Sequence, residues 1–105
     1  MATWVVYLVR CADDTLYCGI TNDLVARLAA HTAGKGAKYT RGRGPLKLVA
    51  TQRTRDKRIA LRIEHAVKRL SRRDKLLLDK ARLAALAAIA RRRLRAAVRE
   101  PRATR

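Results

Sequence analysis

The fold of this chain is decided by residues 5–19, VVYLVRCADDTLYCG. The β-branched and aromatic residues predict two strands, over residues 4–10 and 15–20, and the two aspartates between them are typical of a turn. A two-residue loop would place Tyr7 and Tyr17 on opposite faces of this hairpin, whereas a three-residue loop would place them on the same face. Both loops are common, so the sequence leaves the register open.

Beyond the hairpin, the residue pattern predicts a helix, a third strand and then further helices. The capping residues 21–23 precede apolar residues at helical spacing, which predicts a helix that Gly34 ends. Residues 46–51 predict a third strand, and residues 56–70 carry the apolar stripe of a second helix. Residues 72–99 contain no Gly or Pro and predict one continuous helix, which would be ~42 Å long.

These elements predict an α+β fold, a small three-stranded antiparallel sheet flanked by helices. The 105 residues are enough for one small domain, which we place at residues 1–79. Residues 80–105 are expected to form a basic helical C-terminal extension, with a disordered end. We expect the leucine-rich first half of the long helix to pack on the domain and its arginine-rich second half to project.

The charge of the chain indicates a polyanionic partner. Twenty-six Lys and Arg against 8 Asp and Glu give a formal charge of +18, and nucleic acid is the usual partner of such a chain. An acidic lipid surface is the alternative, favoured only by residues 80–105. No apolar run approaches the ~20 residues of a membrane span, so we expect a cytoplasmic protein without a membrane partner. Cys11 and Cys18 should then be reduced thiols.

A glycine-rich segment, residues 34–44, carries four positive charges, one aromatic residue and no acid. Such a composition is typical of a loop that follows a phosphate backbone. The residues expected to contact nucleic acid there are Lys35, Lys38, Tyr39, Arg41 and Arg43.

The order of several residues along this chain resembles the pattern of the GIY-YIG nuclease superfamily. The two motifs that name it correspond to Val5-Val6-Tyr7 and Tyr17-Cys18-Gly19, and the resemblance extends over about residues 3–78. An arginine and a histidine follow on the first helix and a glutamate on the second. The chain is most similar to the small stand-alone bacterial proteins of this superfamily. It is more distantly similar to the catalytic domain of the excision-repair protein UvrC.

The resemblance implies a metal-dependent endonuclease that hydrolyses DNA. We expect the catalytic side chains to converge on one concave, electropositive surface, with Mg²⁺ or Mn²⁺ held by Glu64 alone. Gly19 would let the backbone approach the nucleic acid closely. The catalytic residues implied are Tyr7, Tyr17, Arg27, His31 and Glu64.

Each assignment has an alternative. Tyrosines on a hairpin usually pack, a histidine at a helix edge is usually a surface residue, and Glu64 could simply pair with Lys68 one turn later. The same fold could also bind nucleic acid without cutting it. Branched DNA and RNA are further possible substrates, and the similarity to UvrC points to DNA repair.

Overall fold

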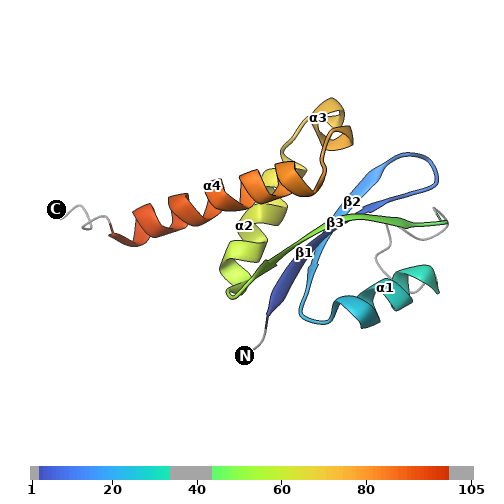
Figure 1. Cartoon of the computed structure of the whole chain (residues 1–105), viewed down its shortest axis with the longest axis horizontal. Helices are drawn as coiled ribbons and strands as arrows, with labels where there is room; N and C mark the ends of the chain where they lie inside the picture. Colours follow the sequence, from blue (N-terminus) through green and yellow to red (C-terminus); the bar gives the residue numbers. More distant parts are fainter. Residues whose placement is uncertain (1–2, 34–43, 100–105) are drawn as a thin grey trace.

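The first two strands form the predicted hairpin, and a third strand completes the sheet. This computed structural model describes residues 3–33 and 44–99 (Figure 1). Strand β1 (Trp4–Arg10) lies in the centre, with β2 (Leu16–Thr21) and β3 (Lys47–Thr54) antiparallel on either side. Strand β2 is therefore an edge strand. The α+β class and the three-stranded antiparallel sheet are confirmed, although β3 continues three residues beyond its expected end.

The hairpin takes the three-residue loop. The Cys11 amide donates a hydrogen bond to the Thr15 carbonyl oxygen at 2.8 Å, which leaves three residues in the turn. The last of them, Asp14, adopts a left-handed backbone with φ of 64°, a conformation that aspartate tolerates better than most residues. This register puts Tyr7 and Tyr17 on the same face of the sheet.

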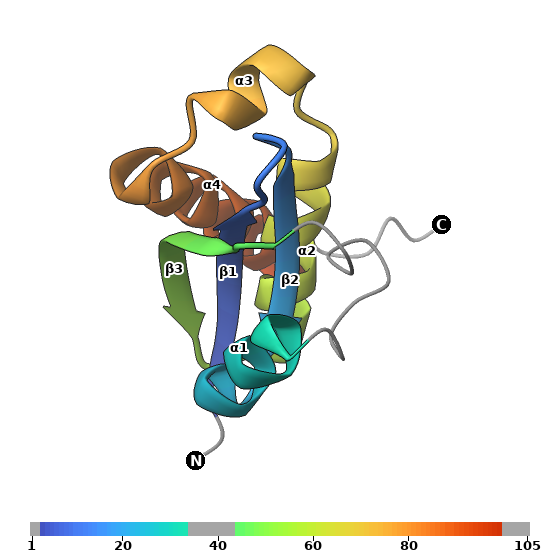
Figure 2. The same cartoon turned by 90° about the vertical axis from the view of Figure 1, so that its right-hand side faces the viewer.

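Helices cover both faces of the sheet. Helix α1 (Leu24–Thr32), capped by Asp23, lies on one face, and α2 (Lys57–Lys68) and α4 (Lys80–Arg99) lie on the other (Figures 1 and 2). The core fills the space between the sheet and the second pair of helices. Its largest fully buried side chains include Val6, Leu8, Ile63, Val67 and Leu83.

Helix α1 is held differently from α2. Within this fully described helix His31 alone is buried, and Val25 remains 81% exposed. The face of the sheet that α1 covers carries Tyr7 and Tyr17 together with the buried Val5 and Val9. The bonds of Tyr7 with Arg27 and His31 add side-chain hydrogen bonds between this face and α1.

The predicted long C-terminal helix is confirmed, but it is not continuous from residue 72 to 99. The chain forms a short helix α3 (Arg72–Leu76), turns, and starts α4 at Lys80 (Figure 1). Asp79 caps the new helix by accepting a hydrogen bond from the Arg82 amide at 2.8 Å. The turn buries Leu78 and brings the apolar stripe of α4 onto α2 and β3. A straight helix would have carried that stripe into solvent, so burial overrides the uninterrupted helical pattern.

The start of the predicted extension belongs to the core. Leu83, Ala87 and Ala90 of α4 are buried in the same cluster as the α2 stripe. The division of the chain at residue 80 stays a prediction, as does the expected disorder of its end, because residues 100–105 lie outside the described residues. The basic segment 34–43 also lies outside the described residues. Among the residues described, no helix is long and apolar enough to cross a membrane.

Candidate active site

Tyr7 is the centre of a hydrogen-bonded cluster between β1 and α1. Its side chain has no exposed surface. The hydroxyl lies 2.8 Å from Nε2 of His31, and Nε of Arg27 donates a hydrogen bond to the same oxygen at 3.2 Å. An arginine N–H can only donate, so the Tyr7 hydroxyl accepts from Arg27, while the direction of its bond with His31 depends on the tautomer of the imidazole.

The spacing of the sequence builds this cluster. Arg27 and His31 are four residues apart, so they lie on the same side of α1 one turn from each other. Tyr17 enters from β2, with its ring centroid 5.5 Å from that of His31 and 6.2 Å from that of Tyr7. Tyr17 is only half-buried, so it is the tyrosine that a ligand reaches first. The structure thus brings four of the five expected catalytic side chains together.

Gly19 is required by the packing of the two tyrosine rings. It pairs with Tyr7 across the hairpin, and the rings of both tyrosines lie over its α-carbon. A β-carbon at this position would lie 2.5 Å from the Tyr7 hydroxyl oxygen and 3.0 Å from Cε2 of Tyr17. The glycine therefore makes room for the cluster itself. Its expected contact with nucleic acid stays a prediction.

Burial sets the protonation of the cluster. It raises the pKa of the Tyr7 hydroxyl, against the lowering effect of the hydrogen bond from Arg27. It lowers the pKa of His31, and the positive charge of Arg27 lowers that pKa further. At neutral pH the histidine is therefore uncharged and can accept the Tyr7 proton. The alternative that His31 is a surface residue is wrong, since only 3% of it is exposed.

The lowered pKa of His31 predicts a loss of stability in mild acid. Below pH ~6.5 the unfolded chain takes up a proton that the folded chain still excludes, so the free energy of unfolding falls as pH falls from about 6.5 toward the lower folded pKa. The melting temperature, followed by circular dichroism from pH 7.5 down to 5, should fall in wild type and fall less in His31→Gln. His65→Gln removes an exposed histidine on α2 and should behave like wild type. Equal pH dependence in wild type and His31→Gln would contradict the assignment.

Glu64 lies on the other side of the edge strand. Helix α2 covers the face opposite α1, and no contact described for residues 3–33 and 44–99 joins Glu64 to the tyrosine cluster. The carboxylate lies near the inward-facing Cys18. Burial raises the pKa of that thiol to about 12, and the negative charge of Glu64 contributes to the increase. Tyr17 and Cys18 are neighbours in β2 that face opposite ways, so Tyr17 and Glu64 flank the same edge. The expected convergence of Tyr7, Tyr17, Arg27 and Glu64 on one concave, electropositive surface stays a prediction.

The ion pair of Glu64 with Lys68 is present but weak. The Lys68 ammonium lies 3.6 Å from a carboxylate oxygen, and the glutamate side chain is 19% exposed while the lysine is 58% exposed. Pairs of this kind on a helix contribute about 0.3–0.5 kcal/mol. The pair therefore leaves the carboxylate available to a stronger ligand.

A divalent ion would find a single protein carboxylate here. Within the described part of the chain, no group of three or more His, Cys, Asp or Glu side chains is positioned to hold a metal. Mg²⁺ commonly binds through one or two carboxylates and completes its shell with water and substrate phosphate. Glu64 fits that pattern, in which the substrate supplies part of the site.

The family described as the GIY-YIG catalytic domain matches residues 3–77. The chain belongs to the GIY-YIG family. The match includes both tyrosines and the arginine, histidine and glutamate positions described above. Membership of the GIY-YIG family indicates a nuclease-type catalytic domain and a nucleic-acid substrate.

Three proteins are similar to this member of the GIY-YIG family. A UPF0213 protein of Natronomonas pharaonis is 53% identical over 70 residues, covering 67% of this chain and 82% of the relative. One of Vibrio cholerae is 52% identical over 73 residues, covering 69% and 72%. The solution NMR structure of a UPF0213 protein from Bacillus halodurans is 51% identical, covers 70% and 78%, and gives a TM-score of 0.47. The names of these relatives state no substrate or reaction.

Proposed function

We propose that this protein is a divalent-metal-dependent endonuclease that hydrolyses phosphodiester bonds in DNA. The observation that carries the proposal is the cluster in which the Tyr7 hydroxyl accepts from Arg27 and lies 2.8 Å from His31. Burying a tyrosine hydroxyl and a neutral histidine beside a half-buried arginine is costly in an ordinary core. A site that handles protons next to an anion would use this arrangement.

The scissile phosphate would lie over the exposed edge of β2. Arg27 uses its Nε–H on Tyr7, and the remaining N–H groups of its guanidinium match phosphate oxygens in geometry and charge. Tyr17 reaches the same edge from the α1 side, and Glu64 reaches it from the α2 side. The substrate would thus be held from both faces of the edge strand.

The two tyrosines would have different roles. Half-buried Tyr17 would orient the attacking water, whereas Tyr7, with no exposed surface, would act from behind it. A proton taken up by the cluster can pass along the short bond from the Tyr7 hydroxyl to Nε2 of His31. The charge of Arg27 stabilises a negative oxygen on Tyr7 and, by opposing a positive charge on His31, favours onward release of the proton.

Glu64 would hold the Mg²⁺ or Mn²⁺ ion together with oxygens of the substrate phosphate. Such an ion supplies charge neutralisation at the phosphate and a more acidic water at neutral pH.

The ion pair of Glu64 with Lys68 favours the second candidate function, a protein that binds nucleic acid without cutting it. Contacts of Lys35, Lys38, Tyr39, Arg41 and Arg43 with the backbone remain part of the proposal.

A cleavage panel tests the proposal. The substrates are single-stranded, duplex, flap and four-way-junction DNA with matching RNA, each with Mg²⁺, Mn²⁺ or EDTA. Wild type should cut at least one DNA substrate with metal and none with EDTA. Arg27→Ala should lower the rate by roughly 10²–10³, the scale for losing one preorganised charge at a developing oxyanion, with a smaller loss of affinity.

Arg73→Ala is the matched control, because Arg73 is an exposed arginine on α3 away from the cluster. It removes the same charge and should leave the rate unchanged. Binding of DNA by wild type with no cleavage of any substrate would instead support the non-catalytic alternative.

A further inference from the structure

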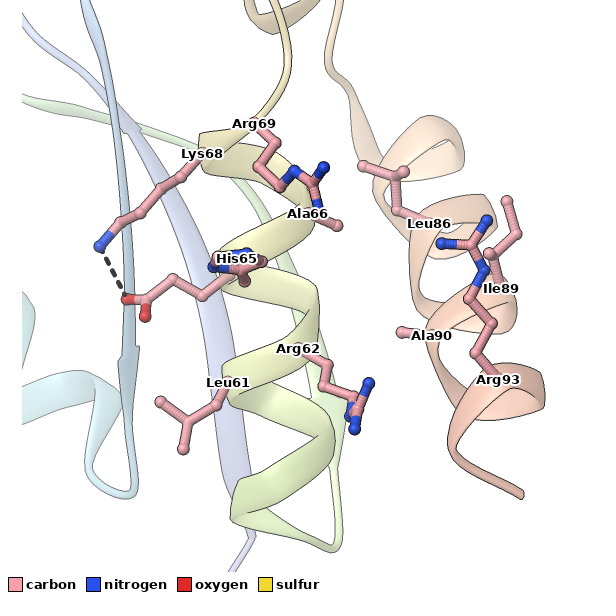
Figure 3. Close-up of a pocket in the computed structure, with 11 residues that line it drawn as sticks. Leu61, Arg62, His65, Ala66, Lys68, Arg69, Leu86, Ile89, Ala90 and Arg93 are labelled. Atoms are coloured by element: carbon pink, nitrogen blue, oxygen red, sulfur yellow. Dashed lines mark ion pairs between the residues drawn. The ribbon is translucent and has the colours of Figure 1, made fainter. Parts of the chain in front are cut away.

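A groove of about 830 Å³ runs between α2 and α4, outside the tyrosine cluster (Figure 3). Its floor is apolar, with Ala66 on one side and Leu86 and Ala90 on the other. Three arginines line it, Arg62 and Arg69 from α2 and Arg93 from α4. In Figure 3 the arginines of α2 extend toward α4, on the opposite side of α2 from Lys68.

The charges of this groove are unbalanced. The one acid that lines it is Glu64, and that carboxylate pairs with Lys68 near the sheet. Three guanidinium groups around one hollow repel each other unless an anion lies between them. Guanidinium groups also bind phosphate through paired N–H donors. The groove therefore has the chemistry of a phosphate-binding track rather than of an apolar pocket.

We propose that this α2–α4 groove binds the sugar-phosphate backbone of one nucleic-acid strand, as it leads away from the cleavage site. The proposal rests on the proposed function and extends it, because Glu64 lines the groove and also borders the β2 edge. The groove wall made by α4 lies beyond residue 77, where the family match ends. This chain thus adds a second binding surface to the catalytic domain.

The apolar face of α4 decides against a lipid surface. A helix that lies in a membrane interface inserts its apolar face into the lipid. In α4 that face is already buried in the protein core, through Leu83, Ala87 and Ala90. The residues lining the groove include no Phe, Tyr or Trp, and His65 is the one ring among them. Binding there should therefore follow the backbone and be indifferent to base sequence.

Salt dependence of DNA binding tests the groove. Binding of fluorescein-labelled oligo(dT) is measured by anisotropy in EDTA, so that cleavage plays no part. The variant carries Arg62→Gln, Arg69→Gln and Arg93→Gln. Each lost phosphate contact should flatten the plot of log K against log salt by about 0.7, so the slope should fall by about 2. Arg93→Gln alone should flatten it by about 0.7.

The matched control removes three exposed arginines that do not line the groove, as Arg55→Gln, Arg73→Gln and Arg82→Gln. It has the same net charge and should keep the wild-type slope. An unchanged slope in the groove variant, or an equal change in both variants, would overturn the proposal. A groove variant that loses binding to vesicles containing phosphatidylglycerol while its DNA slope is unchanged would overturn it in favour of lipid. Failure of the proposed function would show separately, as absence of cleavage by wild type with metal.

Cross-linking tests where the oligonucleotide binds, independently of the salt dependence. Ile89 lines the groove and is 38% exposed, so Ile89→Cys labelled with benzophenone maleimide should cross-link to bound oligo(dT) on illumination. Leu77→Cys is the control, because Leu77 is 50% exposed and does not line the groove. Both native cysteines are buried and should label slowly. Equal yields from the two positions would overturn the proposed location.

Discussion

Replacing Glu64 with glutamine should lower the cleavage rate by roughly two to three orders of magnitude at saturating DNA and Mg²⁺, the scale for losing one group that organises transition-state charge. The amide keeps the size of the side chain but removes the negative charge that would hold the ion. DNA binding in EDTA should be retained or become tighter, because a negative charge is lost beside a basic groove. Single-turnover cleavage and anisotropy measure the two effects separately.

The control for this substitution is Lys68→Gln. Both variants break the ion pair in which the lysine lies 3.6 Å from the carboxylate, but only Glu64→Gln removes the proposed metal ligand. Cleavage by Lys68→Gln at saturating DNA should stay near the wild-type rate. If both variants lost activity equally, the ion pair would be the important feature, and if neither did, Glu64 would have no role in the reaction.

Replacing Gly19 with alanine should both destabilise the protein and abolish most of its activity. The new β-carbon would lie 2.5 Å from the Tyr7 hydroxyl oxygen and 2.6 Å from Cζ, so the ring must move. Tyr7 is fully buried in the centre of the sheet, and overpacking of this kind costs about 1–3 kcal/mol. The displaced hydroxyl would also lose its partners Arg27 and His31. Thermal unfolding and the cleavage assay measure the two losses.

Gly44→Ala provides the matched comparison. A β-carbon at Gly44 would meet no atom within 4 Å, so the melting temperature and cleavage should stay close to wild type. A Gly19→Ala protein with wild-type stability and activity would show that the rings have room to move. The packing explanation for this glycine would then be wrong.

Local chemistry in the sequence was sufficient to predict most of the elements. The start of α1 was indicated by the capping residues Thr21, Asn22 and Asp23, of which Asp23 caps the helix. The apolar stripe of α2 indicated its buried face, which Ile63 and Val67 confirm. The register of the hairpin stayed open because both loop lengths suit the sequence, and only the backbone of Asp14 decides between them.

Long-range contacts explain what the sequence could not predict. The burial of His31 could not be predicted, because its partner Tyr7 lies 24 residues earlier, on a strand whose register was open. The break before α4 had one signal, the capping residue Asp79, within a run that lacked Gly and Pro. The α2–α4 groove depends on that break, so its three arginines could not be grouped from the sequence. The side of the sheet on which Glu64 lies could not be predicted from the sequence, because packing decides which face α2 covers.

Because Arg27 and His31 lie on α1, the tyrosine cluster is intact only while this helix is folded against the sheet. His31 is the single buried residue of α1, so the Tyr7 contacts that the proposed reaction would use also help to hold this helix against the sheet. Such a helix belongs to the low end of the range of local unfolding free energies, whereas α2, anchored by an aliphatic core, belongs to the high end. Every opening of α1 would therefore dismantle the proton path, and a phosphate bound to Arg27 would hold the helix closed.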